Sequence, residues 1–197
     1  GKGFQGCVVV GMGFTFDDTD VKGVASPLSD MRRLVANNPK NADRIFPFIG
    51  GEELNDHPTQ LNTRFIINFD EMSETDARAC YPELMKIVED RVKPERQKSG
   101  KLSPDQAKRA EKWWLYSRTA KELYEKLKHV KRALVVSLVT KHLGFSFLPA
   151  QTVFSHKLGV FPEDSFAFFG CMQSTIHEIW TRTFSSTMKD DLNYSPS

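Results

Sequence analysis

The pattern of apolar and polar positions divides the chain into β-type ends and a helical middle. Short runs rich in β-branched and aromatic residues occupy residues 6–14 and 63–69 near the N-terminus, and each predicts a strand. Toward the C-terminus, similar short runs follow one another closely and predict a β meander. They are residues 133–140, 144–148, 152–154 and 158–161.

Helix start signals lie between and after these runs. Ser26-Pro27, Ser73, Tyr81-Pro82, Ser103-Pro104 and Thr119 each begin a predicted helix. A last helix is expected to begin at Asp164-Ser165, and its apolar positions recur at helical spacing as a buried stripe: Phe168, Phe169, Met172, Ile176, Ile179 and Trp180. The predicted fold class is therefore α+β. It comprises a mixed β-sheet (N-terminal strands plus a C-terminal β meander), a helical middle and one long C-terminal helix.

The length of 197 residues is compatible with one domain, 1–197, in which residues 93–103 are predicted to form a mobile insertion. The three cysteines are far apart and odd in number, which favours a reducing cytoplasm. Neither a secretory leader nor an apolar run of about 18 residues is visible, so no membrane partner is expected. The sequence opens without methionine, and we expect a fragment of a longer protein.

Charge is distributed unevenly along the chain. Residues 41–90 contain four Lys and Arg against eleven Asp and Glu, a balance of −7. Residues 91–132 contain fourteen against five, a balance of +9. Either the two segments pair with each other as solvated helix faces, or the basic segment contacts a phosphate backbone. Charge alone leaves both interpretations open.

Motifs for catalysis are not apparent. The glycines of residues 6–14 fit neither a Walker loop nor a dinucleotide fingerprint, and Asn38-Pro39 is a helix stop rather than the Asn-Pro-Pro-aromatic loop of an adenine methyltransferase. Asp17-Asp18 and Glu52-Glu53 are adjacent pairs, which make poor joint metal ligands. The five histidines are scattered and no pattern has zinc spacing. We expect no catalytic residue, no metal site and no cofactor in this chain.

An ordered set of short segments resembles the target-recognition region of Type IIL, MmeI-like, single-chain restriction–modification enzymes and related adenine methyltransferases. The matching segments cover nearly the whole chain: residues 6–14, 49–55, 64–69, 92–96, 112–114, 141–143, 145–147 and 189–195.

The resemblance implies a function that the residue patterns do not. The chain would select the DNA sequence for an S-adenosylmethionine-dependent N6-adenine methyltransferase, either alone or with a fused Mg²⁺-dependent restriction nuclease. Its partners would be double-stranded DNA together with the methyltransferase and C-terminal helical domains of the same polypeptide. The alternative is an interdomain or protein–protein scaffold that makes no base contacts, and the near-neutral net charge of +2 is compatible with it.

Candidate DNA contacts fall into two groups. Cations of the basic segment and of a predicted loop are expected to contact phosphates: Lys108, Arg109, Lys112, Arg118 and Lys141. The polar loop Ser155, His156 and Lys157 is expected to reach base edges, since Lys and His can donate to purine acceptors. Ordinary surface loops would have the same composition.

The last candidate is the C-terminal pair Lys189 and Asp191. In an extended chain, residues two apart project the same way, so this pair could donate to guanine and accept from cytosine in one G·C pair. The resemblance implies that these positions vary as a charged couple that sets one base of the target site. Asn193 and Tyr194 are expected to support the segment. A surface ion pair without function is the alternative interpretation.

Overall fold

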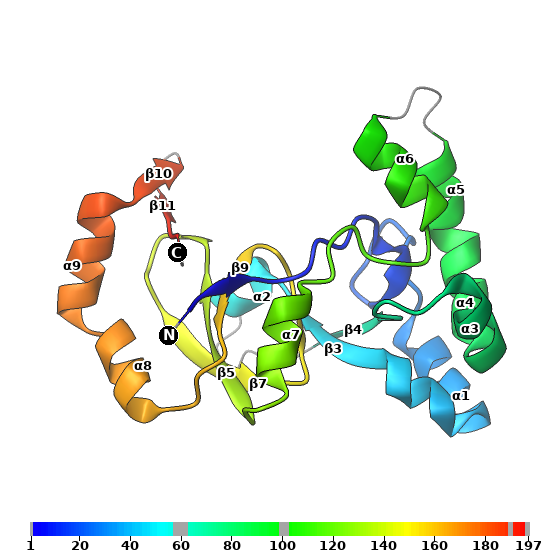
Figure 1. The fold of residues 1–197 in the computed structure, drawn as a ribbon, viewed down its shortest axis with the longest axis horizontal. Coiled ribbons are helices and arrows are strands. Elements are labelled where there is room, and N and C mark those ends of the chain that lie inside the picture. The colour runs from blue at the N-terminus through cyan, green and yellow to red at the C-terminus, as the bar shows by residue number, and fades with distance from the viewer. Residues whose placement is uncertain (1, 57–62, 99–102, 189–190, 196–197) are drawn as a thin grey trace. The chain divides into compact units, whose positions relative to one another are not determined.

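The computed structural model describes residues 2–56, 63–98, 103–188 and 191–195, and the chain divides into two compact units. Unit 1 comprises Gly1–Cys7, Ile49–Asn62 and Ala120–Ser197, and unit 2 comprises Val8–Phe48 and Thr63–Thr119. Both units combine helices with antiparallel strands (Figure 1), so the predicted α+β class is confirmed.

The main sheet of unit 1 has the strand order β1-β9-β5-β7, with every pair antiparallel. The prediction of a meander is wrong in this respect, because β9 pairs with β5 and not with β7. Residues 133–136 of β5 are all buried, as in a strand covered on both faces. β5 also has a neighbouring strand on each edge. The strands of this part are β1 (Phe4–Gln5), β5 (Arg132–Ser137), β7 (Phe145–Pro149), β8 (Val153–Phe154) and β9 (Leu158–Phe161).

Alternate residues of β5 enter two apolar clusters, one on each face of the sheet. Ala133 and Val135 pack in the cluster that includes Leu123 and Leu127 of α7 (Lys121–Leu127) and Leu54 of α2 (Gly51–Asp56). Leu134 and Val136 pack in the opposite cluster, which α8 (Phe166–Met172) partly covers. Figure 1 shows α7 and α8 on opposite sides of this sheet. The period-2 alternation of a strand thus joins two helical layers.

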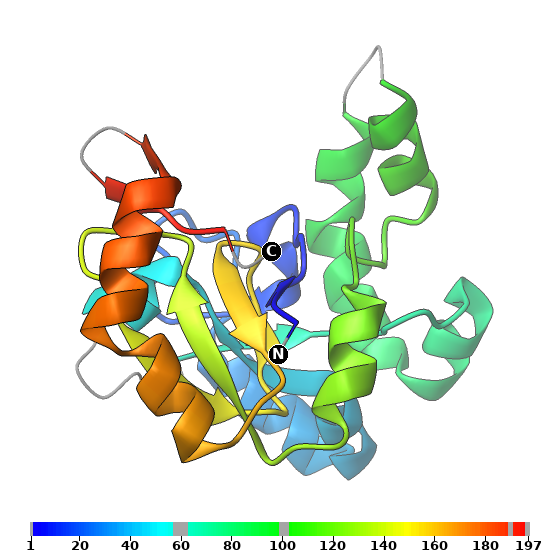
Figure 2. The ribbon, with the colours of Figure 1, turned by 60° about the vertical axis from the view of Figure 1, so that its left-hand side comes forward.

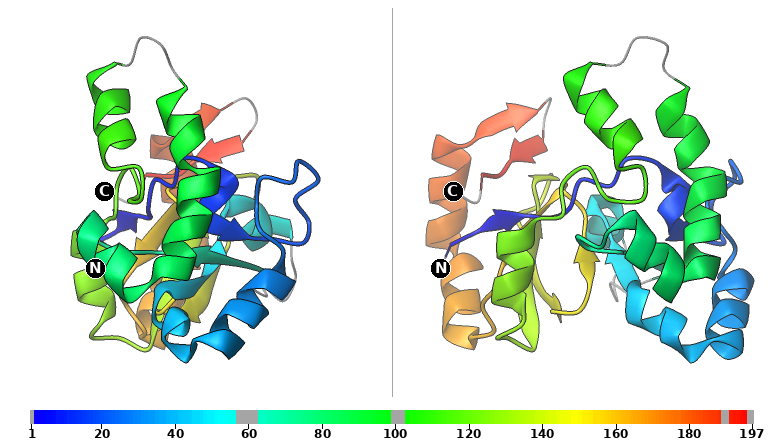
Figure 3. Two further views of the ribbon diagram at one scale, coloured as in Figure 1. Left: turned by 90° about the vertical axis from the view of Figure 1, so that its right-hand side faces the viewer. Right: turned by 45° about the vertical axis from the view of Figure 1, so that its right-hand side comes forward.

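A smaller sheet in unit 1 contains β6 (Val139–Thr140), β10 (Ser186–Met188) and β11 (Asp191–Asn193), in the order β10-β11-β6. Met188 is paired with Asp191 in antiparallel strands, which Figure 3 shows in its right-hand view. The described residues of the C-terminal tail after Met188 include the extended stretch of β11.

The prediction of a single long C-terminal helix is wrong, because two helices, α8 and α9 (Thr175–Phe184), occupy this part of the chain (Figure 2). The start at Ser165 is confirmed, since its hydroxyl accepts from the amide of Ala167. Ser174 then ends one helix and caps the next: its Oγ donates to Cys171 O at 2.7 Å and accepts from His177 N at 3.2 Å. A serine that satisfies backbone groups in this way competes with helix continuation.

The break changes which apolar residues are buried. Phe168, Phe169 and Met172 of α8 are partly buried against the sheet, as predicted for the first half of the stripe. The prediction of burial is wrong for the second half, because Ile176, Ile179 and Trp180 of α9 are 61–82% exposed. Phe184, on the same helix, is 68% exposed. Trp180 and Phe184 stack on each other with ring centroids 4.4 Å apart. Unit 1 thus presents an apolar helix face, the α9 face, that no described residue of the unit covers.

Unit 2 holds the strands β2-β4-β3 in that order and most of the helices. α5 and α6 lie side by side, as the left-hand view of Figure 3 shows. The elements are η1 (Met12–Phe14), β2 (Thr15–Phe16), α1 (Leu28–Asn37), η2 (Pro39–Arg44), β3 (Ile45–Ile49), β4 (Arg64–Ile67), α3 (Glu74–Cys80), α4 (Pro82–Arg91), α5 (Lys93–Gln97) and α6 (Pro104–Glu111).

Predictions for unit 2 differ in their outcome. Ser73 and Ser103 cap α3 and α6 as predicted, and Ser103 forms a full capping box. The strand predicted for residues 6–14 is wrong. Cys7 and Val8 form only isolated bridges, and Gly11 adopts a φ of 92° before a 3₁₀ helix, which interrupts a regular strand. Within the predicted insertion at 93–103, residues 93–97 are helical as α5.

Candidate nucleic-acid interface

Three polar segments of unit 1 converge where β5 ends. The amide of Leu138, directly after β5, donates to Lys157 O at 2.9 Å, and the carbonyl of Leu138 accepts from Tyr194 N at 2.7 Å. β6 follows Leu138 and pairs with β11. We call the three segments, residues 139–141, 155–157 and 191–194, the β5-end cluster. The chain thereby brings together candidate residues that are up to 55 positions apart in sequence.

The turn at residues 155–157 is firmly held by its backbone. Ser155 N donates to Ile49 O, His156 N donates to Cys7 O, and Leu158 N closes the turn on Ser155 O at 3.0 Å. Ser155 is buried and its Oγ accepts from Lys157 N, so this side chain shapes the turn. His156 and Lys157 are exposed and present their side chains at its tip.

The register of the small sheet places two further candidates next to each other. Thr140 pairs with Leu192 in antiparallel strands, so Lys141, directly after β6, and Asp191, at the start of β11, flank the same end of this pairing. Lys141 is exposed, Asp191 is half-buried, and Asn193 Nδ2 donates to Ser186 Oγ at 3.1 Å. Lys189 lies outside the described residues, so its pairing with Asp191 stays a prediction.

Tyr194 anchors this end of the chain. Its ring packs edge-on against Phe145 and His177, with centroids 5.8 and 6.0 Å away, and burial raises its pKa to about 12. Tyr194 therefore holds the end of the 191–194 segment by packing, and its support of a DNA contact stays a prediction.

The basic candidates of unit 2 gather at the C-terminal end of α6. Lys108 and Arg109 lie in its last turn and Lys112 is its C-cap residue, where cations interact favourably with the helix dipole. Among the described residues none of these three, the α6 cations, forms an ion pair. Arg118 is exposed, and its backbone exchanges hydrogen bonds with Val8.

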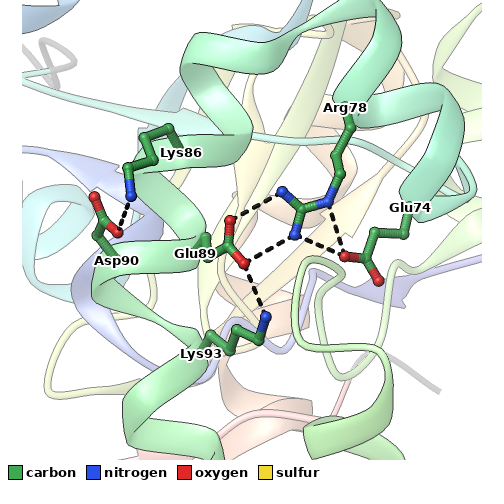
Figure 4. Close-up of polar contacts among 6 residues, drawn as sticks. All are labelled: Glu74, Arg78, Lys86, Glu89, Asp90 and Lys93. Atoms are coloured by element: carbon green, nitrogen blue, oxygen red, sulfur yellow. Dashed lines mark hydrogen bonds and ion pairs between the residues drawn. The ribbon is translucent and has the colours of Figure 1, made fainter.

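Other cations of unit 2 have acidic partners (Figure 4). Arg78 forms a two-pronged contact with Glu89 at 2.9 Å and also contacts Glu74, while Lys93 contacts the same Glu89 at 2.8 Å. These two cations, by hydrogen bonding, lower the pKa of Glu89 to about 2. Opposite charges of neighbouring segments therefore do pair in part, but the α6 cations are left out of the network.

Sequence reasoning missed two polar residues at these places. Asn55 donates to Ser137 Oγ at 3.3 Å and accepts from Thr140 Oγ1 at 3.4 Å, beside the β5-end cluster. Arg96 is buried next to the segment that follows α6. Both lie in segments that carry the family resemblance, 49–55 and 92–96. Their place in these segments is the sequence signal that could have marked them as candidates.

The described ranges contain neither a candidate metal site nor a candidate membrane-spanning helix. His, Cys, Asp and Glu side chains there do not gather in groups of three that could hold a metal ion. Each helix in these ranges is too short or too polar to span a bilayer.

Comparison with known proteins identifies the family. The family described as "MmeI, target recognition domain" matches residues 14–197, which is most of the chain. The chain belongs to the MmeI target recognition domain family. This MmeI-type domain has no match among curated proteins.

The fold of this MmeI-type domain also occurs in a solved structure. It is similar to part of the Type IIL restriction–modification enzyme MmeI, solved in complex with DNA, with a TM-score of 0.72 and 17% sequence identity. The match covers 100% of this chain and 24% of that protein, so the domain spans about a quarter of the length of the enzyme it resembles.

Proposed function

We propose that this domain reads the base sequence of double-stranded DNA and thereby directs an S-adenosylmethionine-dependent N6-adenine methyltransferase carried by the same longer protein. The observation that carries the proposal is the β5-end cluster. Three separate segments present Lys, His, Asp and Asn side chains at one place, and these are the donors and acceptors that distinguish base pairs in the major groove. Family membership supports the same role.

We assign the chemistry to other domains of that longer protein. S-adenosylmethionine would be bound by its methyltransferase domain, and Mg²⁺ by a nuclease domain where one is fused. The role of this chain would be to place a target adenine at that site, so the enzyme as a whole would be a site-specific DNA methyltransferase of the cytoplasm.

The other domains of the same polypeptide are also its proposed protein partners. The α9 face supports this, because Ile176, Ile179, Trp180 and Phe184 offer the aromatic and aliphatic side chains that dominate interface cores. A scaffold role without base contacts is the second candidate function, and this same face favours it. Substitutions in the β5-end cluster distinguish the two roles. They should change the methylated sequence if the domain reads bases and leave it unchanged if the domain is a scaffold.

The decisive experiment reverses the charges of Lys189 and Asp191 in the full-length protein. The double variant Lys189→Glu, Asp191→Arg is expected to exchange G·C for C·G at one position of the methylated motif, because donor and acceptor are exchanged. A correct bidentate contact supplies about 1–3 kcal/mol of discrimination. Methylome sequencing of a host that expresses each protein measures the motif.

A matched control is available in unit 2. Lys86 and Asp90 form an exposed ion pair at 2.8 Å on α4, and Lys86→Glu with Asp90→Arg makes the same reversal away from the cluster. The control should leave the motif unchanged. If the Lys189 and Asp191 variant also methylates the original motif at a normal level, these two residues do not read DNA.

A further inference from the structure

Arg96 of α5 is a buried cation that forms no ion pair with a carboxylate of the described residues. Its guanidinium donates only to backbone carbonyls: those of Trp113 at 3.1 Å, Leu115 at 2.7 Å and Val10 at 3.1 Å are the shortest contacts. The side chain is 8% exposed and also lies over the ring of Phe14. Buried charges are normally paired with an opposite charge, whereas the direct contacts of this guanidinium are with carbonyl dipoles, and Glu95 acts on it only through its charge.

A pocket of about 380 Å³ lies beside this arginine, entirely within unit 2. It is lined by four cations and a single carboxylate. The lining residues are Arg96, Asp105, Lys108, Arg109, Lys112, Leu115, Tyr116 and Ser117. Three of the four cations are the α6 cations, which form no ion pair with any described residue. The pocket therefore combines a positive potential with donors that are available to an anion.

Two donors at this pocket have unmet hydrogen-bonding capacity. Arg96 Nε and Ser117 Oγ are buried and have no partner in the described part of the chain. Buried polar groups in native proteins almost always have partners, and a buried group without one costs free energy. A ligand that accepts hydrogen bonds here would reduce that cost.

Electrostatics favour an anion at the same place. Burial lowers the pKa of Arg96 to about 10. The charge of Arg109 acts in the same direction and that of Glu95 opposes it. Arg96 therefore remains protonated at neutral pH, and a negative charge between it and the α6 cations would relieve their mutual repulsion.

We propose that this pocket binds one phosphate group of the DNA backbone. Arg109, Lys108 and Lys112 would contact its non-bridging oxygens, and Arg96 would act as a positioning residue that holds the 112–115 segment against Val10. Guanidinium groups match the geometry of phosphate oxygens, and such a contact sets the register of a protein on the duplex. The proposal rests on the proposed function, and it names a contact that base reading alone does not require.

Methylphosphonate scanning of the target duplex tests this proposal in the full-length protein. Each phosphate of a duplex that contains the methylated motif is replaced in turn by a neutral methylphosphonate, and Kd is measured by fluorescence anisotropy at one salt concentration. Neutralising the phosphate that occupies the pocket should raise Kd about tenfold in the wild type. In the variant Arg109→Gln, Lys112→Gln the same replacement should change Kd by less than about twofold, because the contacts between the pocket and this phosphate are already lost.

The control variant Lys86→Gln, Lys128→Gln removes the same charge from two exposed, ion-paired lysines. It should retain the tenfold effect of the wild type. If the pocket variant shows the wild-type ratio at every phosphate, the proposal is overturned although DNA recognition stands. A full-length protein that methylates no motif would instead contradict the proposed function.

Free phosphate offers the same chemistry as the backbone. Inorganic phosphate is therefore titrated against the wild type at constant ionic strength, with thermal unfolding as the readout. Stabilisation by inorganic phosphate together with a flat methylphosphonate scan would overturn the proposal and assign the pocket to a free anion. Competition between inorganic phosphate and the duplex, lost in the pocket variant, would support it.

Discussion

Neighbouring basic residues of unit 2 differ in what surrounds them, and this difference decides what each can do. Lys93 is engaged by Glu89, Arg96 is buried among carbonyls, and Lys108 is exposed without an ion pair among the described residues. Only the last kind can release counterions on meeting a phosphate without first breaking an internal contact. Charge counted along the sequence does not separate these three environments.

Lys108→Ala should weaken binding of all DNA sequences alike and lower the slope of log Kd against log salt by about one. The reason is that a phosphate contact carries charge but no sequence information. Titrations of specific and random duplexes at several salt concentrations measure both effects. Lys86→Ala removes an exposed cation that is already paired, and an equal loss of slope in this control would contradict the assignment.

At the residue scale, the exposure of the candidate side chains could be predicted from the sequence more readily than the burial of a cation. Lys108, Lys112, His156 and Lys157 are exposed, as a polar pattern on helix ends and turns indicates. Arg96 could not be predicted, because the burial of an arginine depends on carbonyls supplied by residues 10 and 112–115. Those carbonyls are brought to it only by the tertiary fold.

At the scale of elements, ion pairs join three consecutive helices of unit 2. Glu89 of α4 contacts Arg78 of α3 and Lys93 of α5 (Figure 4). Networks of this kind contribute more to stability than isolated surface pairs, because one carboxylate serves two cations. The relative positions of α3, α4 and α5 therefore depend in part on Glu89.

Glu89→Gln should lower the free energy of unfolding by on the order of 1 kcal/mol at pH 7. The pKa of Glu89 is about 2 in the folded protein, and about 4.3 is expected when the chain is unfolded. The contribution of Glu89 to the free energy of unfolding is therefore fully present above about pH 5, and it is lost as the pH falls from there toward about 2. Urea unfolding of both proteins at several pH values tests this. Asp90→Asn, in an exposed pair, should cost less, and a difference for Glu89→Gln that is constant down to pH 2 would refute the mechanism.

The two C-terminal helices show what periodicity can and cannot predict. Helical spacing of apolar residues is present on both α8 and α9, as the sequence indicates. Periodicity gives the face of a helix but not what covers that face. The break at Ser174 redirects the second helix, so only the first half of the predicted stripe reaches the sheet.

Phe169→Ala should destabilise the isolated domain by about 2 kcal/mol, because its ring packs on Phe147 at a centroid distance of 5.5 Å and covers the cluster of β5. Trp180→Ala should change stability by less than about 0.5 kcal/mol, since its side chain is exposed. Thermal or urea unfolding of both variants compares them directly. Equal destabilisation would show that α9 packs against the domain itself.

At the scale of the molecule, the α+β class followed from the order of strand and helix signals, but the arrangement of the strands did not. The run at residues 133–136 is apolar at every position, which indicates a strand buried on both faces. It does not tell which strands lie beside it, and these are β7 on one side and β9 on the other. Nor does local pattern reveal that residues 8–48 and 63–119 form a separate unit, since this depends on contacts between distant segments.

The interleaving of the two units has a consequence for how sequence preference could be inherited or exchanged. All three segments of the β5-end cluster fall in the continuous stretch 120–197, whereas the α6 cations belong to unit 2. One crossover near residue 120 would therefore transfer the whole cluster between related genes and leave the α6 cations of the recipient in place. The recipient would still supply β1 and α2. β1 is joined to β9 through backbone hydrogen bonds, which tolerate sequence change, so Leu54 of α2 is a position where a recombinant must keep compatible packing.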